Sequence, residues 1–129
     1  MPKQVPVRNR PKNLNLFTIR LPINAVVSIL HRMSGMLLFI LIPVLIWSMQ
    51  ASLSSEASFA ELGDMFQHWT LKLILIGLSW PFFHHLYAGL RHLGQDVHWM
   101  TTLNKARFSS RIVLMLGACS MLIFAYYIW

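Results

Sequence analysis

The sequence predicts an all-α membrane protein with three transmembrane helices, and three observations lead to this fold class. First, 56% of the 129 residues are apolar and only 12% are charged, whereas a soluble domain is about 45–50% apolar and about 25% charged. Second, Asp, Glu, Lys and Arg are excluded from three long segments, residues 33–55, 73–90 and 112–129. Third, these segments lack the period-2 alternation of membrane barrel strands, so helices are expected.

The first helix is expected at about residues 28–50, the second at 70–93 and the third at 109–129, within one integral-membrane domain that covers residues 1–129. A bilayer core about 30 Å thick needs roughly 20 helical residues, and each uncharged segment reaches that length with its flanks. Residues 1–24 precede the first helix and are expected to lie outside the bilayer. The connections are short and polar, so any function must lie in the helices or at their ends.

Basic residues lie on one side of this predicted topology. The N-terminal segment, the start of the first helix and the second connection together carry a charge of +9, whereas the first connection with the start of the second helix carries −2. The positive-inside rule therefore predicts a cytoplasmic N-terminus and a periplasmic C-terminus, as in a multi-pass protein of a bacterial inner membrane. Because the net charge of +7 reflects topology, binding of nucleic acid is not expected.

One polar group lies at the cytoplasmic start of the first helix. Ser28, His31, Arg32 and Gly35 are spaced i, i+3, i+4 and i+7, so they share one helical face. A hydroxyl, an imidazole and a permanent cation on this face can bind a carbonyl or carboxylate group. Alternatively, Arg32 extends to the lipid headgroups, and Ser28, Ser34 and Gly35 only permit close helix packing. The spacing leaves both interpretations open.

A second polar group lies late in the second helix, at the same predicted depth. His85, Gly89 and His92 are spaced i, i+4 and i+7, whereas His84 points about 100° away. A neutral imidazole in an apolar helix can be an axial ligand of haem iron, with Gly89 leaving room for the porphyrin and His92 reaching a propionate. The second ligand is then His31 or a residue of another chain. Histidines that only form hydrogen bonds between helices would have the same spacing.

Two segments of the sequence resemble the signatures of a known family, the large cytochrome b membrane-anchor subunits of succinate dehydrogenase (succinate:quinone oxidoreductase). The second signature, H-x-x-x-G-x-R-H-L-x-x-D, is matched by residues 85–96. The first signature is matched in three pieces, at residues 10–16, 19–23 and 28–35. Lys12 in the first signature and Gln95 in the second depart from the residues usual in the family, at positions away from the proposed ligands. With the three-helix layout, the resemblance covers nearly the whole chain.

The resemblance implies that this chain packs with a smaller three-helix anchor subunit into a helix bundle that encloses one haem b. The pair would hold an iron–sulfur subunit and a flavoprotein subunit on the cytoplasmic side. His85 would be an axial ligand of the haem iron, with the other ligand coming from the small anchor subunit. His31 would lie by the haem propionates, where the spacing also puts His92. Ser28 and Arg32 would line a ubiquinone pocket beside the iron–sulfur subunit.

The function expected from this resemblance is that of a subunit that is not catalytic on its own, in a complex that passes electrons from succinate to ubiquinone in the citric acid cycle and respiratory chain. The sequence has no paired carboxylates, phosphate-binding loop or nucleophile constellation that would indicate a self-contained hydrolase or kinase. A different class stays open, in which the chain is a small homo-oligomeric transporter or a purely structural anchor without haem.

Overall fold

The computed structural model describes residues 20–129, and this part of the chain is entirely helical apart from short connections. Its four helices, in chain order, are α1 (Ile23–Ser54), α2 (Glu56–Gln67), α3 (Trp69–Asp96) and α4 (Leu103–Ile128). Residues 1–19 lie outside the described part of the chain. They include most of the N-terminal segment expected at residues 1–24 and the signature piece at residues 10–16.

The long helices α1, α3 and α4 are each long and apolar enough to cross a membrane. This confirms the all-α class with three candidate spans. The ranges expected from the sequence, residues 28–50, 70–93 and 109–129, overlap these helices, although α1 begins five residues earlier and continues four residues further. The positions at which the helices enter and leave the bilayer stay predictions.

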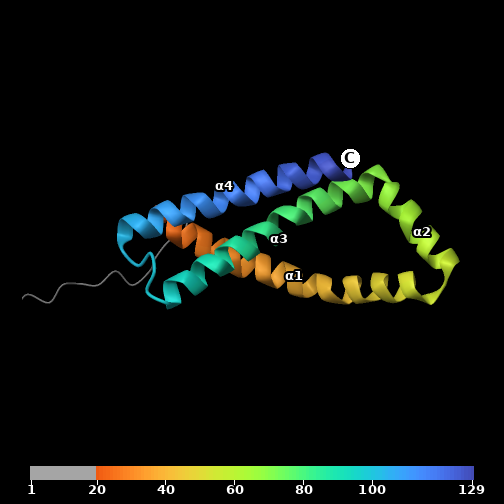
Figure 1. Ribbon diagram of the computed structural model, residues 1–129, viewed down its shortest axis with the longest axis horizontal. Helices are drawn as coiled ribbons and strands as arrows, with labels where there is room; N and C mark the ends of the chain where they lie inside the picture. Colours follow the sequence, from red (N-terminus) through yellow and green to blue (C-terminus); the bar gives the residue numbers. More distant parts are fainter. Residues whose placement is uncertain (1–19) are drawn as a thin grey trace, which may run out of the picture.

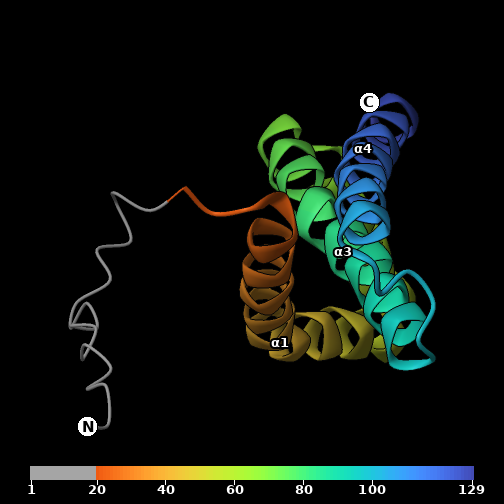
Figure 2. The same ribbon diagram turned by 90° about the vertical axis from the view of Figure 1, so that its left-hand side faces the viewer.

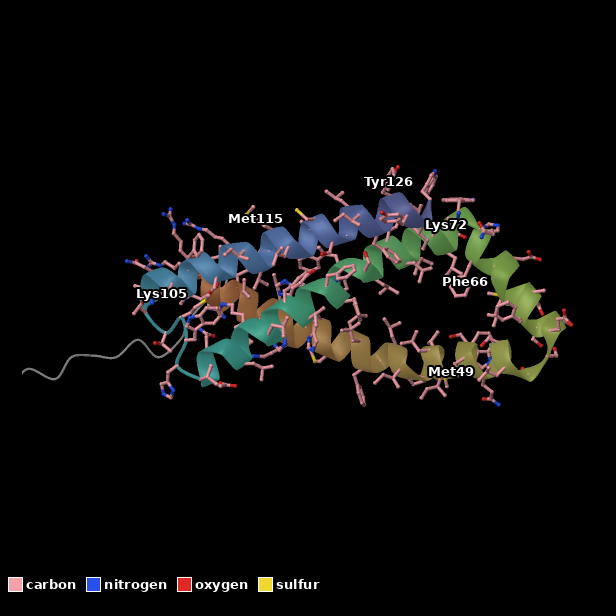
Figure 3. All side chains as sticks on the ribbon, in the orientation of Figure 1. Met49, Phe66, Lys72, Lys105, Met115 and Tyr126 are labelled. Carbon is pink, nitrogen blue, oxygen red and sulfur yellow. The ribbon has the colours of Figure 1, made fainter. Side chains whose placement is uncertain are left out.

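Helix α3 lies between α1 and α4 and packs against both (Figures 1 and 2). In Figure 1, α1 and α3 meet near the end that carries the start of α1 and diverge toward the end that carries α2. Val27, Ala88 and Val113, one from each long helix, form the buried apolar core of the described residues. Small residues at such contacts let membrane helices approach closely. Most large apolar side chains instead point outward, as Met115 does in Figure 3.

Helix α2 corrects the expectation of a plain polar connection between the first two spans. Its N-terminus is capped by Ser55, whose Oγ accepts a hydrogen bond from the backbone N–H of Ser58 (3.1 Å). Glu56 follows in the first turn, where a negative charge interacts favourably with the helix dipole. The connection therefore contains the start signals of a helix.

One face of α2 is apolar and packs toward α1. Phe59, Leu62 and Phe66 recur at i, i+3 and i+7, and together with Met49 of α1 they line a cavity of about 260 Å³ (Figure 3). This pattern is typical of a helix that lies along a membrane surface.

Charge is separated between the two ends of the bundle. The end with the start of α1 and the start of α4 carries exposed basic side chains, among them Arg32, Lys105 and Arg111 (Figure 3 labels Lys105). At the opposite end, α2 carries three of the four acidic residues of the chain. Lys72, also at that end, donates a hydrogen bond to the carbonyl oxygen of Trp129 (3.5 Å).

Candidate functional site

Three of the histidines singled out by their spacing gather where α1 meets α3. The rings of His31 and His85 are stacked, with centroids 4.2 Å apart and an interplanar angle of 12°. The ring of His92 is tilted against that of His31, with centroids 5.0 Å apart. All three side chains are half-buried. The structure therefore brings His31 of the first polar group together with His85 and His92 of the second in one site, which we call the α1–α3 histidine cluster.

The ring of His85 is held by the backbone of α1. Its Nδ1 lies 3.0 Å from the carbonyl oxygen of His31 and 3.2 Å from the Oγ of Ser34. Ser34 is almost fully buried, and its hydroxyl donates to the same carbonyl oxygen (2.9 Å). Because a carbonyl oxygen only accepts, the proton of a neutral His85 is assigned to Nδ1. The lone pair of Nε2 is then free to bind an electrophile.

Gly35 makes room for this ring. A Cβ at position 35 would lie 2.8 Å from Cε1 of His85, closer than real Cβ contacts. The glycine that shares the polar stripe of α1 therefore serves as a cradle for His85. Gly89 of α3 faces the ring of His31 of α1, and the Nε2 atom of His31 would lie 3.5 Å from a Cβ at position 89. The space beside Gly89 thus holds an imidazole here, where the sequence analysis expected a porphyrin.

His84 lies on a different face of α3, as its offset from His85 predicts. It is fully buried and stacks on Trp80, with ring centroids 5.0 Å apart. Its backbone packs against Gly117 of α4, where a Cβ would lie 3.7 Å from the Cα of His84. Neither ring nitrogen makes a hydrogen bond of full geometry among residues 20–129, although the ring faces the backbone of Val27 in α1. Sequence reasoning missed this buried imidazole, because the offset between adjacent residues does not reveal which face is enclosed.

Ser28 and Arg32 lie one turn apart on α1, the helix that carries His31. Ser28 is half-buried and Arg32 is exposed. By helical spacing both lie on the side of α1 that carries Gly35, next to the cradle of His85. Within residues 20–129 no three or more His, Cys, Asp or Glu side chains are arranged to hold a metal ion between them. The cluster thus offers one oriented imidazole, and the same helix α1 adds the hydroxyl of Ser28 and the exposed guanidinium group of Arg32.

Comparison with known proteins identifies the family. The family described as succinate dehydrogenase/fumarate reductase transmembrane subunit matches residues 6–124. A relative from Coxiella burnetii is 32% identical over 122 residues, which cover 93% of this chain and 97% of the relative. A relative from Paracoccus denitrificans is 34% identical over 106 residues, 82% of each chain. A third, from Rickettsia felis, is 28% identical over 121 residues, 94% of this chain and 92% of the relative.

All three relatives carry the name succinate dehydrogenase cytochrome b556 subunit. The family match covers α1 and α3, most of α4 and both polar groups. The chain therefore belongs to the succinate dehydrogenase/fumarate reductase transmembrane subunits and is one of the cytochrome b membrane anchors of succinate dehydrogenase.

Proposed function

We propose that this anchor binds one haem b through His85 and contributes to the reduction of ubiquinone by electrons from succinate. The observation that carries the proposal is the hydrogen bond of His85 Nδ1 to the carbonyl oxygen of His31. Metal-ligating histidines commonly donate their second ring nitrogen to a carbonyl or carboxylate, which fixes the ring and its tautomer. A bound haem b would supply a one-electron carrier at this position.

The chain's own residues fit such a cofactor at His85 better than at His84. The His85 ring is half-buried and oriented by Gly35, with Nε2 free of the contacts that hold Nδ1. His84 has no exposed surface and is enclosed by Trp80 and the backbone next to Gly117. A planar cofactor at His84 would require α3 and α4 to separate. His85 is therefore the proposed ligand.

His31 and His92 are proposed to hold the haem propionates. The ring of His31 stacks on that of His85, and the ring of His92 lies against that of His31. Each imidazole can donate an N–H to a carboxylate, and the nearby Arg32 adds positive charge. Both side chains would bind the cofactor without contacting its iron.

Ser28 and Arg32 are proposed to bind ubiquinone. Ser28 and Arg32 lie one helical turn apart on α1, and the side chain of Arg32 is exposed. Negative charge develops on a quinone oxygen as it is reduced, and a fixed cation at a membrane interface stabilises that charge. Arg32 would therefore act more strongly on the reduced form than on the bound quinone.

The proposal includes partner subunits, because this chain has one oriented imidazole. A smaller anchor subunit would supply the second axial ligand and cover the apolar face of α1, where Phe39 and Ile40 are 73% and 67% exposed. The iron–sulfur and flavoprotein subunits would dock at the basic end, which the positive-inside rule assigns to the cytoplasm. The C-terminus would then face the periplasm of a bacterial inner membrane.

The test is the visible spectrum of the assembled complex with His85→Leu, with His68→Leu as the control because His68 lies in the turn before α3, far from the cluster. Dithionite-reduced minus oxidised spectra should lose or shift the haem bands in His85→Leu and keep them in His68→Leu. Subunit content confirms assembly. An unaltered spectrum in an assembled His85→Leu complex would contradict the assignment, and a wild-type complex without haem would support a purely structural anchor.

A further inference from the structure

A groove between α3 and α4 is separate from the histidine cluster. It encloses about 230 Å³ near the basic end of the bundle, and its walls are mostly apolar. The lining includes Tyr87, Leu90, Arg91, Trp99, Ile112 and Leu116. One charged group, that of Arg91, faces this otherwise apolar space.

The charge of Arg91 is not neutralised by its neighbours. Its Nε donates to the Oγ of Ser109 (3.0 Å) and its Nη2 to the carbonyl oxygen of Ala106 (3.3 Å), and both acceptors are neutral. A guanidinium group has five N–H donors, and the bonds to Ser109 and Ala106 are the ones that Arg91 makes within residues 20–129. Residues 1–19 contain no Asp or Glu, so that segment cannot supply a side-chain carboxylate to Arg91.

The end of α3 places an aromatic ring over the same groove. The backbone N–H of Trp99 donates to the carbonyl oxygen of Gly94, and that of His98 to the carbonyl oxygen of Gln95, each at 2.9 Å. This is the Schellman pattern that ends many helices, and it usually has glycine where His98 stands. His98 and Met100 adopt φ angles of 62° and 65°, which non-glycine residues seldom do.

The consequence of this turn is the position of Trp99. Its Cε3 would lie 3.5 Å from a Cβ on Gly94, so the ring packs back onto the last turns of α3. Trp99 is still 64% exposed, and tryptophan is enriched at the level of lipid headgroups. The groove therefore has a cation and an interfacial aromatic ring at one end and an apolar channel between two membrane helices at the other.

We propose that this groove binds one anionic phospholipid of the bilayer. The guanidinium group of Arg91 holds the phosphate, for which its planar fork is well suited. An acyl chain lies along Leu90, Ile112 and Leu116, and the ring of Trp99 lies beside the glycerol backbone. Basic pockets between transmembrane helices are known to hold anionic lipid headgroups.

The preference for an anionic lipid comes from the neighbouring charges. Lys105 shares a stripe of α4 with Ser109, Ile112 and Leu116, because these positions are spaced i, i+4, i+7 and i+11. The Lys105 side chain is exposed and lies at the end of the bundle where α4 begins (Figure 3). A phosphatidylglycerol headgroup, which keeps a net negative charge, interacts more favourably with two cations than a zwitterionic phosphatidylcholine does.

The test counts the lipids that remain on the assembled complex. The complex is purified in mild detergent, and retained phosphatidylglycerol is counted by native mass spectrometry for wild type, Arg91→Gln and Leu116→Trp. The tryptophan fills the channel while leaving the contacts of Arg91 intact. Arg111→Gln and Leu122→Trp are matched controls, because both positions are exposed on α4 outside the groove.

Wild type and both controls should retain one more phosphatidylglycerol per copy of this chain than the two groove variants. Titration of delipidated complex should show binding at least tenfold weaker in Arg91→Gln, since hydrogen bonds to charged groups have this magnitude, and weaker binding of phosphatidylcholine to wild type. If the Arg91→Gln complex fails to assemble, the number of phosphatidylglycerol molecules retained by the Leu116→Trp complex tests the proposal.

Equal retention in groove variants and controls would overturn the proposal. A wild-type complex that retains no such lipid would also overturn it and would indicate that a partner subunit or residues 1–19 cover the groove. The lipid count is independent of the haem spectrum, so failure here is distinguishable from failure of the proposed function.

Discussion

The Nδ1 of His85 lies 3.0 Å from the backbone carbonyl oxygen of His31, so one imidazole joins α3 to the main chain of α1. The acceptor belongs to the backbone, and substitution of the His31 side chain leaves it in place. The orientation of His85 depends instead on the residues that shape this contact, Ser34 and Gly35. This separation of roles lets each contribution be tested by itself.

Gly35→Ala should disturb the ring directly. The new methyl group would lie 2.8 Å from Cε1 of His85, and overpacking of this kind typically costs about 1–3 kcal/mol. We expect lower haem content and a lower thermal midpoint of the assembled complex. Gly77→Ala is the control, because a Cβ there meets nothing within 4 Å and alanine favours a helix. Equal haem content and equal thermal midpoints in the two variants would contradict the conclusion that Gly35 leaves room for the ring of His85.

Ser34→Ala should change the electronic environment of the ligand while keeping the cofactor. It removes one acceptor 3.2 Å from Nδ1 and leaves the carbonyl bond. A neutral hydrogen bond contributes about 0.5–1.5 kcal/mol, which corresponds to roughly 20–60 mV for one electron. Redox titration of the haem bands should show a shift of this size. Ser79→Ala, whose hydroxyl bonds only within its own helix, should show none, and matching potentials would refute the role of Ser34.

Arg32→Leu should impair quinone reduction and spare the oxidation of succinate. Loss of a group that stabilises developing negative charge commonly lowers turnover by about 10²–10³-fold, and we expect at least a tenfold loss of ubiquinone reductase activity. Succinate oxidation by an artificial dye should be unchanged. Arg107→Leu, an exposed cation on α4, serves as the control. Quinone reduction at the wild-type rate in Arg32→Leu would rule out the assignment.

His84→Phe should stabilise the complex, in contrast to His84→Ala. Neither nitrogen of the buried imidazole makes a hydrogen bond of full geometry among residues 20–129, although the ring faces the backbone of Val27 in α1, and an unsatisfied buried polar group costs about 1–3 kcal/mol. Phenylalanine removes that cost and keeps the stacking on Trp80, whereas alanine leaves a cavity against Gly117. Thermal unfolding should give the highest midpoint for His84→Phe, a lower one for the wild type and the lowest for His84→Ala. A Phe variant as unstable as the Ala variant would reveal a function of the imidazole nitrogens.

The helices and the histidine cluster were predictable from the sequence because both follow from periodic or excluded residues. Absence of charge marks the long helices, and equal depth with i, i+4 and i+7 spacing brings His31 near His85 and His92. The contact of Ser34 with His85 is not predictable from spacing, because the rotation of α1 about its axis is set by how α1 meets α3. The same packing decides that His84 is enclosed while His85 is accessible.

Helix α2 and the turn that follows α3 were not predicted from the sequence. The cap residue Ser55 and the apolar spacing of Phe59, Leu62 and Phe66 indicate a helix, but the polar composition of the segment is equally typical of a loop. A 12-residue helix is marginal in isolation, and contact with α1 stabilises it. The turn that places Trp99 was not predictable, because it uses His98 and Met100 in conformations usual for glycine.

The buried apolar core formed by Val27, Ala88 and Val113 is small for a bundle of three long helices. Under the proposed function a smaller anchor subunit covers the apolar face of α1, so this chain would be better regarded as half of a folding unit than as a finished fold. Its effective stability then rises with the amount of partner available, as in obligate complexes. A cell that makes this chain in excess over its partner would be expected to degrade the surplus, and balanced synthesis of the two chains becomes a condition for either to accumulate.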